Sequence, residues 1–177
     1  MNRRNAIGNI VILSLGTMVM PSCSQKEEAL VKYKNIKVTA SDEKMLAQLS
    51  EAIIPKSNNF IGAADVKAHE FTLMMLDDCY EPDKQNKYVA GLNEFEKEVN
   101  KKYGNGFSSC TPSQKKQWLS LVEKKKDMPG DVQFFYQTTK RHTLQAFTSS
   151  QEYMTGVLKY KMVPGSNFKG CVPLKKT

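Results

Sequence analysis

Apolar residues recur at helical spacing through most of this chain, and that periodicity strongly limits the folds open to it. The clearest case lies between Pro82 and Gly104, where the apolar positions are Tyr88, Leu92, Phe95, Val99 and Tyr103. Gaps of three or four residues place these side chains on one face of an α-helix. Pro82 near the start and Gly104 at the end are typical of helix boundaries. No segment shows sustained alternation with a period of two, so we predict an all-α protein.

Three capping boxes mark further helix starts. They pair Thr39 with Asp42, Thr111 with Gln114, and Ser149 with Glu152. In this motif the first side chain accepts a hydrogen bond from the amide three residues on, and the later side chain reaches back. The helix after Thr39 should stop at Pro55, since proline cannot continue a helix.

Two other segments are also predicted to be helical. One runs from about Ala64 to Tyr80, and its nearly continuous apolar stretch makes it a candidate for the central helix. Its expected buried stripe consists of Ala68, Phe71, Met75 and Cys79. The other begins with Asp131 as its cap and carries Phe134 and Phe135. We therefore expect a single bundle-like domain of about six helices.

The first 23 residues have the pattern of an export signal. Arg3 and Arg4 precede an apolar run that is too short to span a bilayer, and a small residue stands directly before Cys23. We predict a lipoprotein signal over residues 1–22, a polar tether over 23–38 and a helical domain with a C-terminal tail over 39–177. Lipidated Cys23 would anchor the chain at the periplasmic side of a bacterial envelope.

The arginine pair also partly matches a twin-arginine signal, which exports proteins that have already folded. The match is partial because Ala6 stands where phenylalanine is usual and Gly8 where lysine is usual. The alternative is a general secretory signal that contains two arginines.

The charge pattern argues against a nucleic-acid-binding protein. The formal net charge of the whole chain is +8, and loss of Arg3 and Arg4 leaves 24 basic against 18 acidic residues. Arg141 is then the only arginine, although arginine supplies most specific base contacts. The lysines are scattered, so they are interpreted as a solvated surface. We interpret Arg141 as part of a buried or interfacial ion pair.

The residues that catalysis or metal binding would need do not cluster in the sequence. His69 and His142 lie far apart, and the zinc-protease, hydrolase and dinucleotide-binding motifs are all missing. We therefore predict no catalytic, cofactor-binding or metal-binding residue in this chain. Asp77 and Asp78, at an unfavourable helix end, are expected to pair with a lysine or cap the next segment.

Three cysteines remain if Cys23 is lipidated, which suggests one disulfide and one free thiol. A bond between Cys79 and Cys171 would fasten the C-terminal tail to the helices. Cys110 is then the free thiol, although Cys110 as a bonding partner stays open.

Several segments, in order along the chain, resemble the gluconate 2-dehydrogenase subunit 3 family. They are Leu49 to Phe71 (LSEAIIPKSNNFIGAADVKAHEF), Leu76 to Tyr80 (LDDCY) and Gly170 to Leu174 (GCVPL). Within the first, Ile53-Ile54-Pro55 followed by Gly62-Ala63 and Val66 is similar to a family motif, with Ile61 where proline is common. The resemblance extends over roughly residues 41 to 174.

This resemblance implies a non-catalytic small subunit. Its partner would be a large, FAD-dependent subunit of the glucose-methanol-choline type, which oxidises a sugar or polyol, and in some complexes a cytochrome c subunit is added. The export signal would carry the folded flavoprotein out with the small subunit. A stand-alone envelope lipoprotein that binds a ligand or acts as a scaffold is the alternative.

A partner would need an exposed apolar surface on this chain. The candidates are the turn-rich segment Pro55 to Ala63, including Phe60 and Ile61, and the aromatic pair Phe134 and Phe135. For the aromatic residues, packing in the core is the alternative interpretation.

Overall fold

The computed structural model describes residues 33–124 and 128–161, which form α-helices and no β-strand. This confirms the all-α prediction. The elements are α2 (Ala40–Ile53), α3 (Ala68–Cys79), α4 (Pro82–Tyr103), the 3-10 turn η1 (Phe107–Ser109), α5 (Pro112–Glu123), α6 (Gly130–Thr148) and α7 (Gln151–Gly156). Arg3, Arg4, Cys23 and Cys171 lie outside the described residues.

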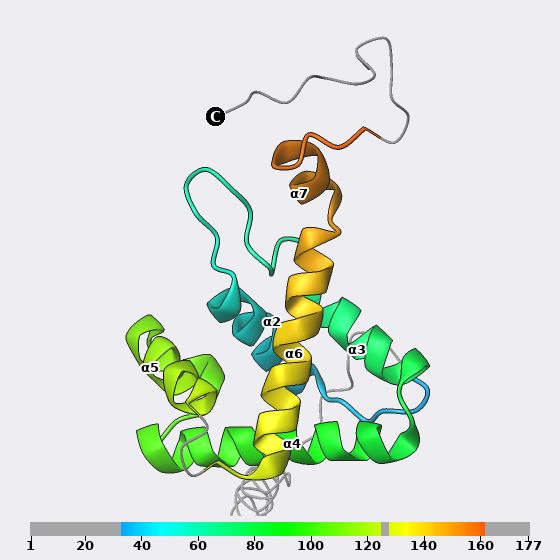
Figure 1. Ribbon diagram of the computed structural model, residues 1–177. Coiled ribbons are helices and arrows are strands. Elements are labelled where there is room, and N and C mark those ends of the chain that lie inside the picture. The colour runs from blue at the N-terminus through cyan, green and yellow to red at the C-terminus, as the bar shows by residue number, and fades with distance from the viewer. Residues whose placement is uncertain (1–32, 125–127, 162–177) are drawn as a thin grey trace, which may run out of the picture.

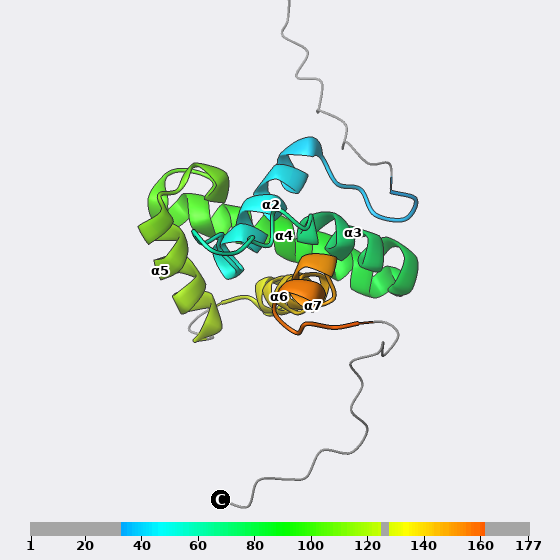
Figure 2. The same ribbon diagram turned by 90° about the horizontal axis from the view of Figure 1, so that it is seen from above.

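Helix α6 stands at the centre of the fold, and it contacts each of the other described α-helices. Figure 1 shows α6 rising from α4, which lies across the base, with α7 following at the upper end of α6. Seen from above in Figure 2, α3 and α5 lie on opposite sides of α6. The sequence suggested α3 as the central helix, and that interpretation is wrong.

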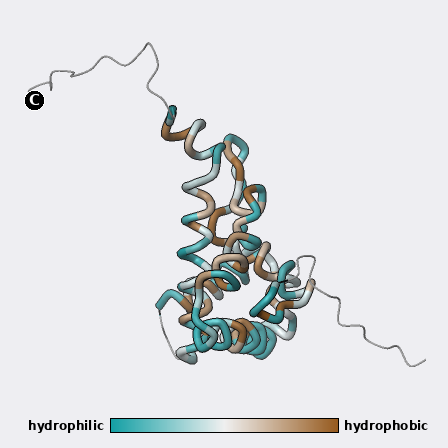
Figure 3. The backbone as a smooth tube through the Cα atoms, turned by 90° about the vertical axis from the view of Figure 1, so that its right-hand side faces the viewer, coloured by the Kyte–Doolittle hydropathy of each residue, from teal (hydrophilic) through white to brown (hydrophobic). Residues whose placement is uncertain are grey.

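Hydrophilic and hydrophobic residues are interleaved along the backbone, as Figure 3 shows. Over residues 33–124 and 128–161, no helix has the length and apolar character needed to cross a membrane.

Two of the predicted capping boxes are confirmed. Thr39 Oγ1 accepts from the amide of Asp42 at 3.3 Å, and the Asp42 carboxylate accepts from the amide of Thr39 at 2.9 Å. Thr111 and Gln114 form the same reciprocal pair at 3.3 and 2.8 Å. Local sequence therefore sets where α2 and α5 begin.

Two other helix starts differ slightly from the prediction. Helix α7 is capped by Ser150, whose hydroxyl accepts from the Tyr153 amide at 3.2 Å, rather than by Ser149. Helix α6 begins after Pro129, and Asp131 lies in its first turn, where its charge is favourable to the helix dipole.

Helix α3 starts at Ala68 rather than Ala64, because Lys67 has a left-handed backbone with φ of 52°. Of the predicted stripe only Ala68 is fully buried, since Cys79 is exposed while Phe71 and Met75 are half-buried. The buried face is formed by Ala68, Thr72, Leu73, Leu76 and Asp77. Burial of Thr72 is tolerated because its hydroxyl donates to the Ala68 carbonyl at 2.9 Å.

Asp77 fastens the chain that leads into α2. Its carboxylate accepts from the amides of Lys34, Asn35 and Ile36 at 2.8, 2.6 and 3.0 Å. Burial raises the pKa of Asp77, but these three bonds outweigh it and hold the pKa below its usual value. Asp77 thus caps a preceding segment rather than the next one. Because Ile36 is buried, the end of the expected tether is packed on the helical domain.

Helices α4 and α6 approach each other closely through Gly91. Next to it, Tyr88 and Phe135 pack with ring centroids 4.9 Å apart, and Phe95 lies 5.2 Å from Phe135. The Tyr88 hydroxyl lies 2.8 Å from Thr139 Oγ1, so the buried polar atoms of this contact have partners. A Cβ on residue 91 would stand 2.2 Å from the Asp131 carbonyl oxygen and 2.8 Å from Phe135 Cβ.

Gly91→Ala should therefore destabilise the protein. We expect the free energy of unfolding to fall by about 1–3 kcal/mol through overpacking, even though alanine normally favours a helix interior by about 1 kcal/mol. Urea unfolding followed by circular dichroism measures the change. Gly130→Ala is the matched control, because a Cβ there meets no atom within 4 Å. Equal stability of the two variants would contradict the proposed close approach.

Candidate partner-binding site

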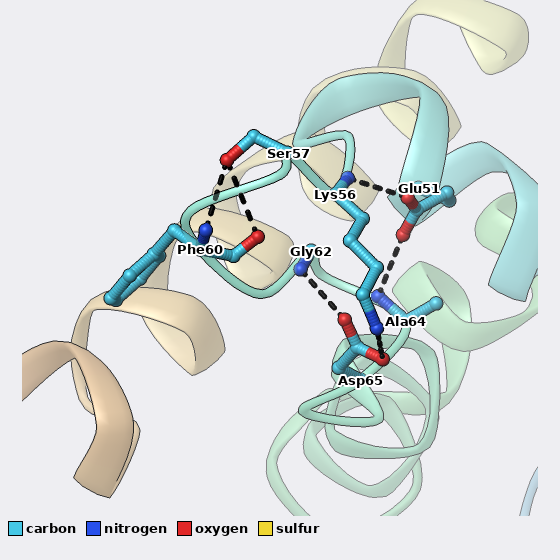
Figure 4. Close-up of polar contacts among 7 residues, drawn as sticks. All are labelled: Glu51, Lys56, Ser57, Phe60, Gly62, Ala64 and Asp65. Atoms are coloured by element: carbon cyan, nitrogen blue, oxygen red, sulfur yellow. Dashed lines mark hydrogen bonds and ion pairs between the residues drawn. The ribbon is translucent and has the colours of Figure 1, made fainter.

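The segment between α2 and α3, residues 54–67, forms a braced loop that we call the α2–α3 loop (Figure 4). Glu51, in the last turn of α2, holds it from below. One carboxylate oxygen accepts from the Lys56 amide at 2.7 Å, and the other accepts from the Ala64 amide at 3.2 Å. A single side chain thus fixes both the first and the last part of the loop.

Asp65 provides a second brace. Its carboxylate accepts from the Gly62 amide at 2.9 Å and pairs with the Lys56 ammonium at 3.0 Å. The Gly62 bond and then Lys56 hold the pKa of Asp65 below its usual value. At the tip, the Ser57 amide donates to the Phe60 carbonyl at 3.0 Å, and the Phe60 amide donates to Ser57 Oγ at 3.1 Å. The turn-rich sequence therefore folds into one defined shape.

Gly62 is required at its position by space. A Cβ there would lie 2.6 Å from a Glu51 carboxylate oxygen and 2.6 Å from the Lys56 amide nitrogen. Because the amide nitrogen belongs to the backbone, it cannot move aside as a flexible side chain would. The glycine thus allows Glu51 to reach both of its amide partners.

Phe60 packs the α2–α3 loop against the junction of α6 and α7. Its ring packs edge-on to Phe147 and Tyr153, with centroids 6.0 and 6.5 Å away. Pro55 is exposed, while Phe60 and Ile61 are half-buried. These three residues therefore lie on a braced, partly apolar surface and stay candidates for partner contact.

A groove of about 530 Å³ lies between α2 and α5, and we call it the α2–α5 groove. It is lined by Gln48, Glu51, Ala52 and Pro55 on one side and by Pro112, Lys115 and Lys116 on the other. Because Pro55 belongs to both features and Glu51 of the groove also holds the loop, the groove and the α2–α3 loop form one continuous surface.

The aromatic pair in α6 does not form a surface patch. Phe135 is fully buried against Tyr88 and Phe95 and belongs to the core. The prediction that Phe135 contacts a partner is therefore wrong. Phe134 is half-buried beside the core, with the Lys87 ammonium 5.4 Å from its ring centroid. Helical geometry explains the split, since adjacent residues point to different sides of a helix.

His142, Tyr80 and Arg141 form a small network. The Tyr80 hydroxyl lies 2.8 Å from His142 Nε2 and accepts a hydrogen bond from Arg141. Burial lowers the pKa of His142. Arg141 is exposed, so the buried ion pair is wrong, while an interfacial ion pair stays a prediction. Across the described ranges, no group of three or more His, Cys, Asp or Glu residues could hold a metal ion.

Cys79 is exposed and Cys110 is buried, and the two are not bonded to each other. Burial raises the pKa of the Cys110 thiol, which makes it a poor nucleophile. Since Cys171 lies outside the described residues, the Cys79–Cys171 disulfide stays a prediction.

Sequence reasoning missed the residues that shape this surface. Glu51 gave no signal because its partners are main-chain amides five and thirteen residues away. Asp65 did carry a weak signal in the sequence. It lies three residues after Gly62, and short acidic side chains often cap turns beside glycine. Lys115 and Lys116 were counted among the scattered surface lysines.

Residues 40–165 match the sequence profile described as gluconate 2-dehydrogenase subunit 3. The match covers well over half of the chain, so this protein belongs to the gluconate 2-dehydrogenase subunit 3 family, as the resemblance indicated. Searches of curated proteins and of solved structures gave no significant match.

We predict that Gly62→Ala loosens the α2–α3 loop, because the added methyl group forces Glu51 away from its amide partners. The amides of Lys56 and Ala64 should exchange hydrogen faster, and stability should fall by about 1–3 kcal/mol. Hydrogen–deuterium exchange with mass spectrometry tests both. Asn58→Ala, at an exposed position of the same loop, is the control. Unchanged exchange in Gly62→Ala would show that Glu51 does not brace the loop.

Proposed function

We propose that this chain is the non-catalytic small subunit that exports, anchors or stabilises a periplasmic flavin-dependent sugar or polyol dehydrogenase. The observation that carries the proposal is the family match over residues 40–165, which makes the chain a subunit of a dehydrogenase complex. The export signal at Arg3 and Arg4 supplies the direction of transport.

In this proposal the chemistry belongs to the partners. A large subunit of the glucose-methanol-choline type binds FAD and oxidises the substrate, and a cytochrome c subunit, where present, passes electrons to the membrane. The small subunit offers its partner the α2–α3 loop, around Pro55, Phe60 and Ile61. A braced loop loses little conformational freedom on binding, which favours a stable complex.

The membrane attachment is proposed to be a lipid on Cys23. Within the predicted tether, the amides of Lys34, Asn35 and Ile36 bind the Asp77 carboxylate, so this end of the tether belongs to the helical domain. The helical domain would stay close to the periplasmic face of the membrane, together with its flavoprotein partner.

Export of the flavoprotein is expected to depend on this subunit. Deleting the subunit should leave the flavoprotein in the cytoplasm, and replacing Arg3-Arg4 by Lys-Lys should do the same if the twin-arginine route is used. Cell fractionation with flavin and activity assays measures the distribution. The purified chain alone should show no oxidoreductase activity. Flavoprotein that still reaches the periplasm without the subunit would end the escort role.

Lipidation of Cys23 is tested separately. Metabolic labelling with a fatty-acid analogue should tag the wild-type chain, and Cys23→Ala should lose the label. The Cys110→Ala variant controls for labelling at another cysteine. Equal labelling of Cys23→Ala and wild type would refute the lipid anchor.

A further inference from the structure

The α2–α5 groove is lined by apolar side chains and by two lysines, Lys115 and Lys116, which we call the rim. Ala52 and Pro55 from the α2 side face Pro112 from the start of α5, while Lys115 and Lys116 stand on the following turn of α5. The fold holds the rim in place. The Thr111–Gln114 capping box fixes the start of α5, and the buried side chains of Trp118 and Val122 pack α5 against the core.

Among the described residues, the groove lining contains two lysines and one carboxylate, so its lining charge is positive. That carboxylate belongs to Glu51, which accepts hydrogen bonds from the amides of Lys56 and Ala64 and is held at the base of the α2–α3 loop. The Lys115 ammonium donates to the Gln48 amide oxygen and lies 5.4 Å from the Phe107 ring centroid, and neither contact neutralises it. Within the described part of the chain, neither Lys115 nor Lys116 forms an ion pair.

We propose that the α2–α5 groove binds an extended segment of the large dehydrogenase subunit in which apolar side chains are flanked by Asp or Glu. The proposal rests on the proposed function and adds the binding surface and the chemistry of the segment. Apolar side chains of the segment would cover the proline and alanine side chains of the groove, and its carboxylates would meet the two ammonium groups.

The charge pattern favours a partner over the chain's own C-terminal segment. Residues 162–177 contain Lys169, Lys175 and Lys176 and no acidic residue, so they would bring like charge to the rim. The groove also continues into the α2–α3 loop through Pro55, so one partner can contact both.

Reversing the charge of the two lysines tests whether they bind carboxylates of the partner. The probe is the flavoprotein that co-purifies with the full-length tagged chain. Lys115→Glu with Lys116→Glu should weaken its binding about tenfold at moderate salt, while helix α5 is kept because glutamate and lysine have similar helix propensities. The control is Lys44→Glu with Lys84→Glu, which makes the same change in net charge at two exposed positions. Circular dichroism verifies that both variants are folded.

Carbodiimide cross-linking tests the identity of the occupant, because it joins an ammonium group to a carboxylate in direct contact. In the intact complex, mass spectrometry should find Lys115 or Lys116 bonded to an Asp or Glu of the flavoprotein, beside apolar residues. Lys116→Arg should keep flavoprotein binding and lose any cross-link at position 116.

Cross-links from the rim to Glu27 or Glu28 of the chain's own tether would overturn the assignment. Equal flavoprotein binding by the groove and control variants would also overturn it, while leaving the proposed function intact. If the wild-type chain carries no flavoprotein at all, the proposed function fails and the groove assignment fails with it.

Discussion

The close crossing of α4 and α6 at Gly91 sets the positions of the other helices. With no side chain at that point, the two backbones approach until a Cβ would touch the Asp131 carbonyl, and Tyr88, Phe95 and Phe135 pack around the contact. Helix α6 then extends away from α4 and contacts α2, α3, α5 and α7 in turn. The bundle is therefore organised around one helix rather than built from equivalent neighbours.

The same helix connects the core to the candidate interface. Phe147, near the end of α6, supports Phe60 at the tip of the α2–α3 loop, and Glu51 of α2 holds the base of that loop. Several polar side chains in the described part hold main-chain groups in this way. Asp77 binds three amides, Glu96 accepts from the Phe107 amide at 3.2 Å, and Gln133 donates to the Val122 carbonyl at 2.8 Å. Such contacts stabilise loops and helix ends.

Local signals in the sequence predicted the helices well. The capping boxes at Thr39 and Thr111 located α2 and α5 because both partners of each box lie within one turn. The regular spacing from Tyr88 to Val99 identified the buried face of α4, since one stripe was apolar and the opposite stripe was not. In α3 the apolar residues run almost continuously, so the periodicity could not select a face, and only Ala68 of the predicted stripe is fully buried.

The candidate site was predictable only in part. The turn-rich segment from Pro55 to Ala63 was identified by composition, but its shape depends on Glu51 and Asp65, whose partners are backbone amides that no side-chain pattern reveals. Burial of Phe135 and exposure of Lys116 in the groove depend on how α5 and α6 are placed by the whole bundle. Contacts between segments distant in sequence decide these features.

Purification of the full-length tagged chain from membranes under native conditions examines the account most directly. We expect a large flavoprotein to co-purify, and the complex should show the visible absorption of bound flavin and dehydrogenase activity. After the two subunits are separated, the small subunit alone should show neither. Recovery of this chain by itself, with neither flavoprotein nor flavin, would contradict its proposed role as a subunit of a flavoprotein complex.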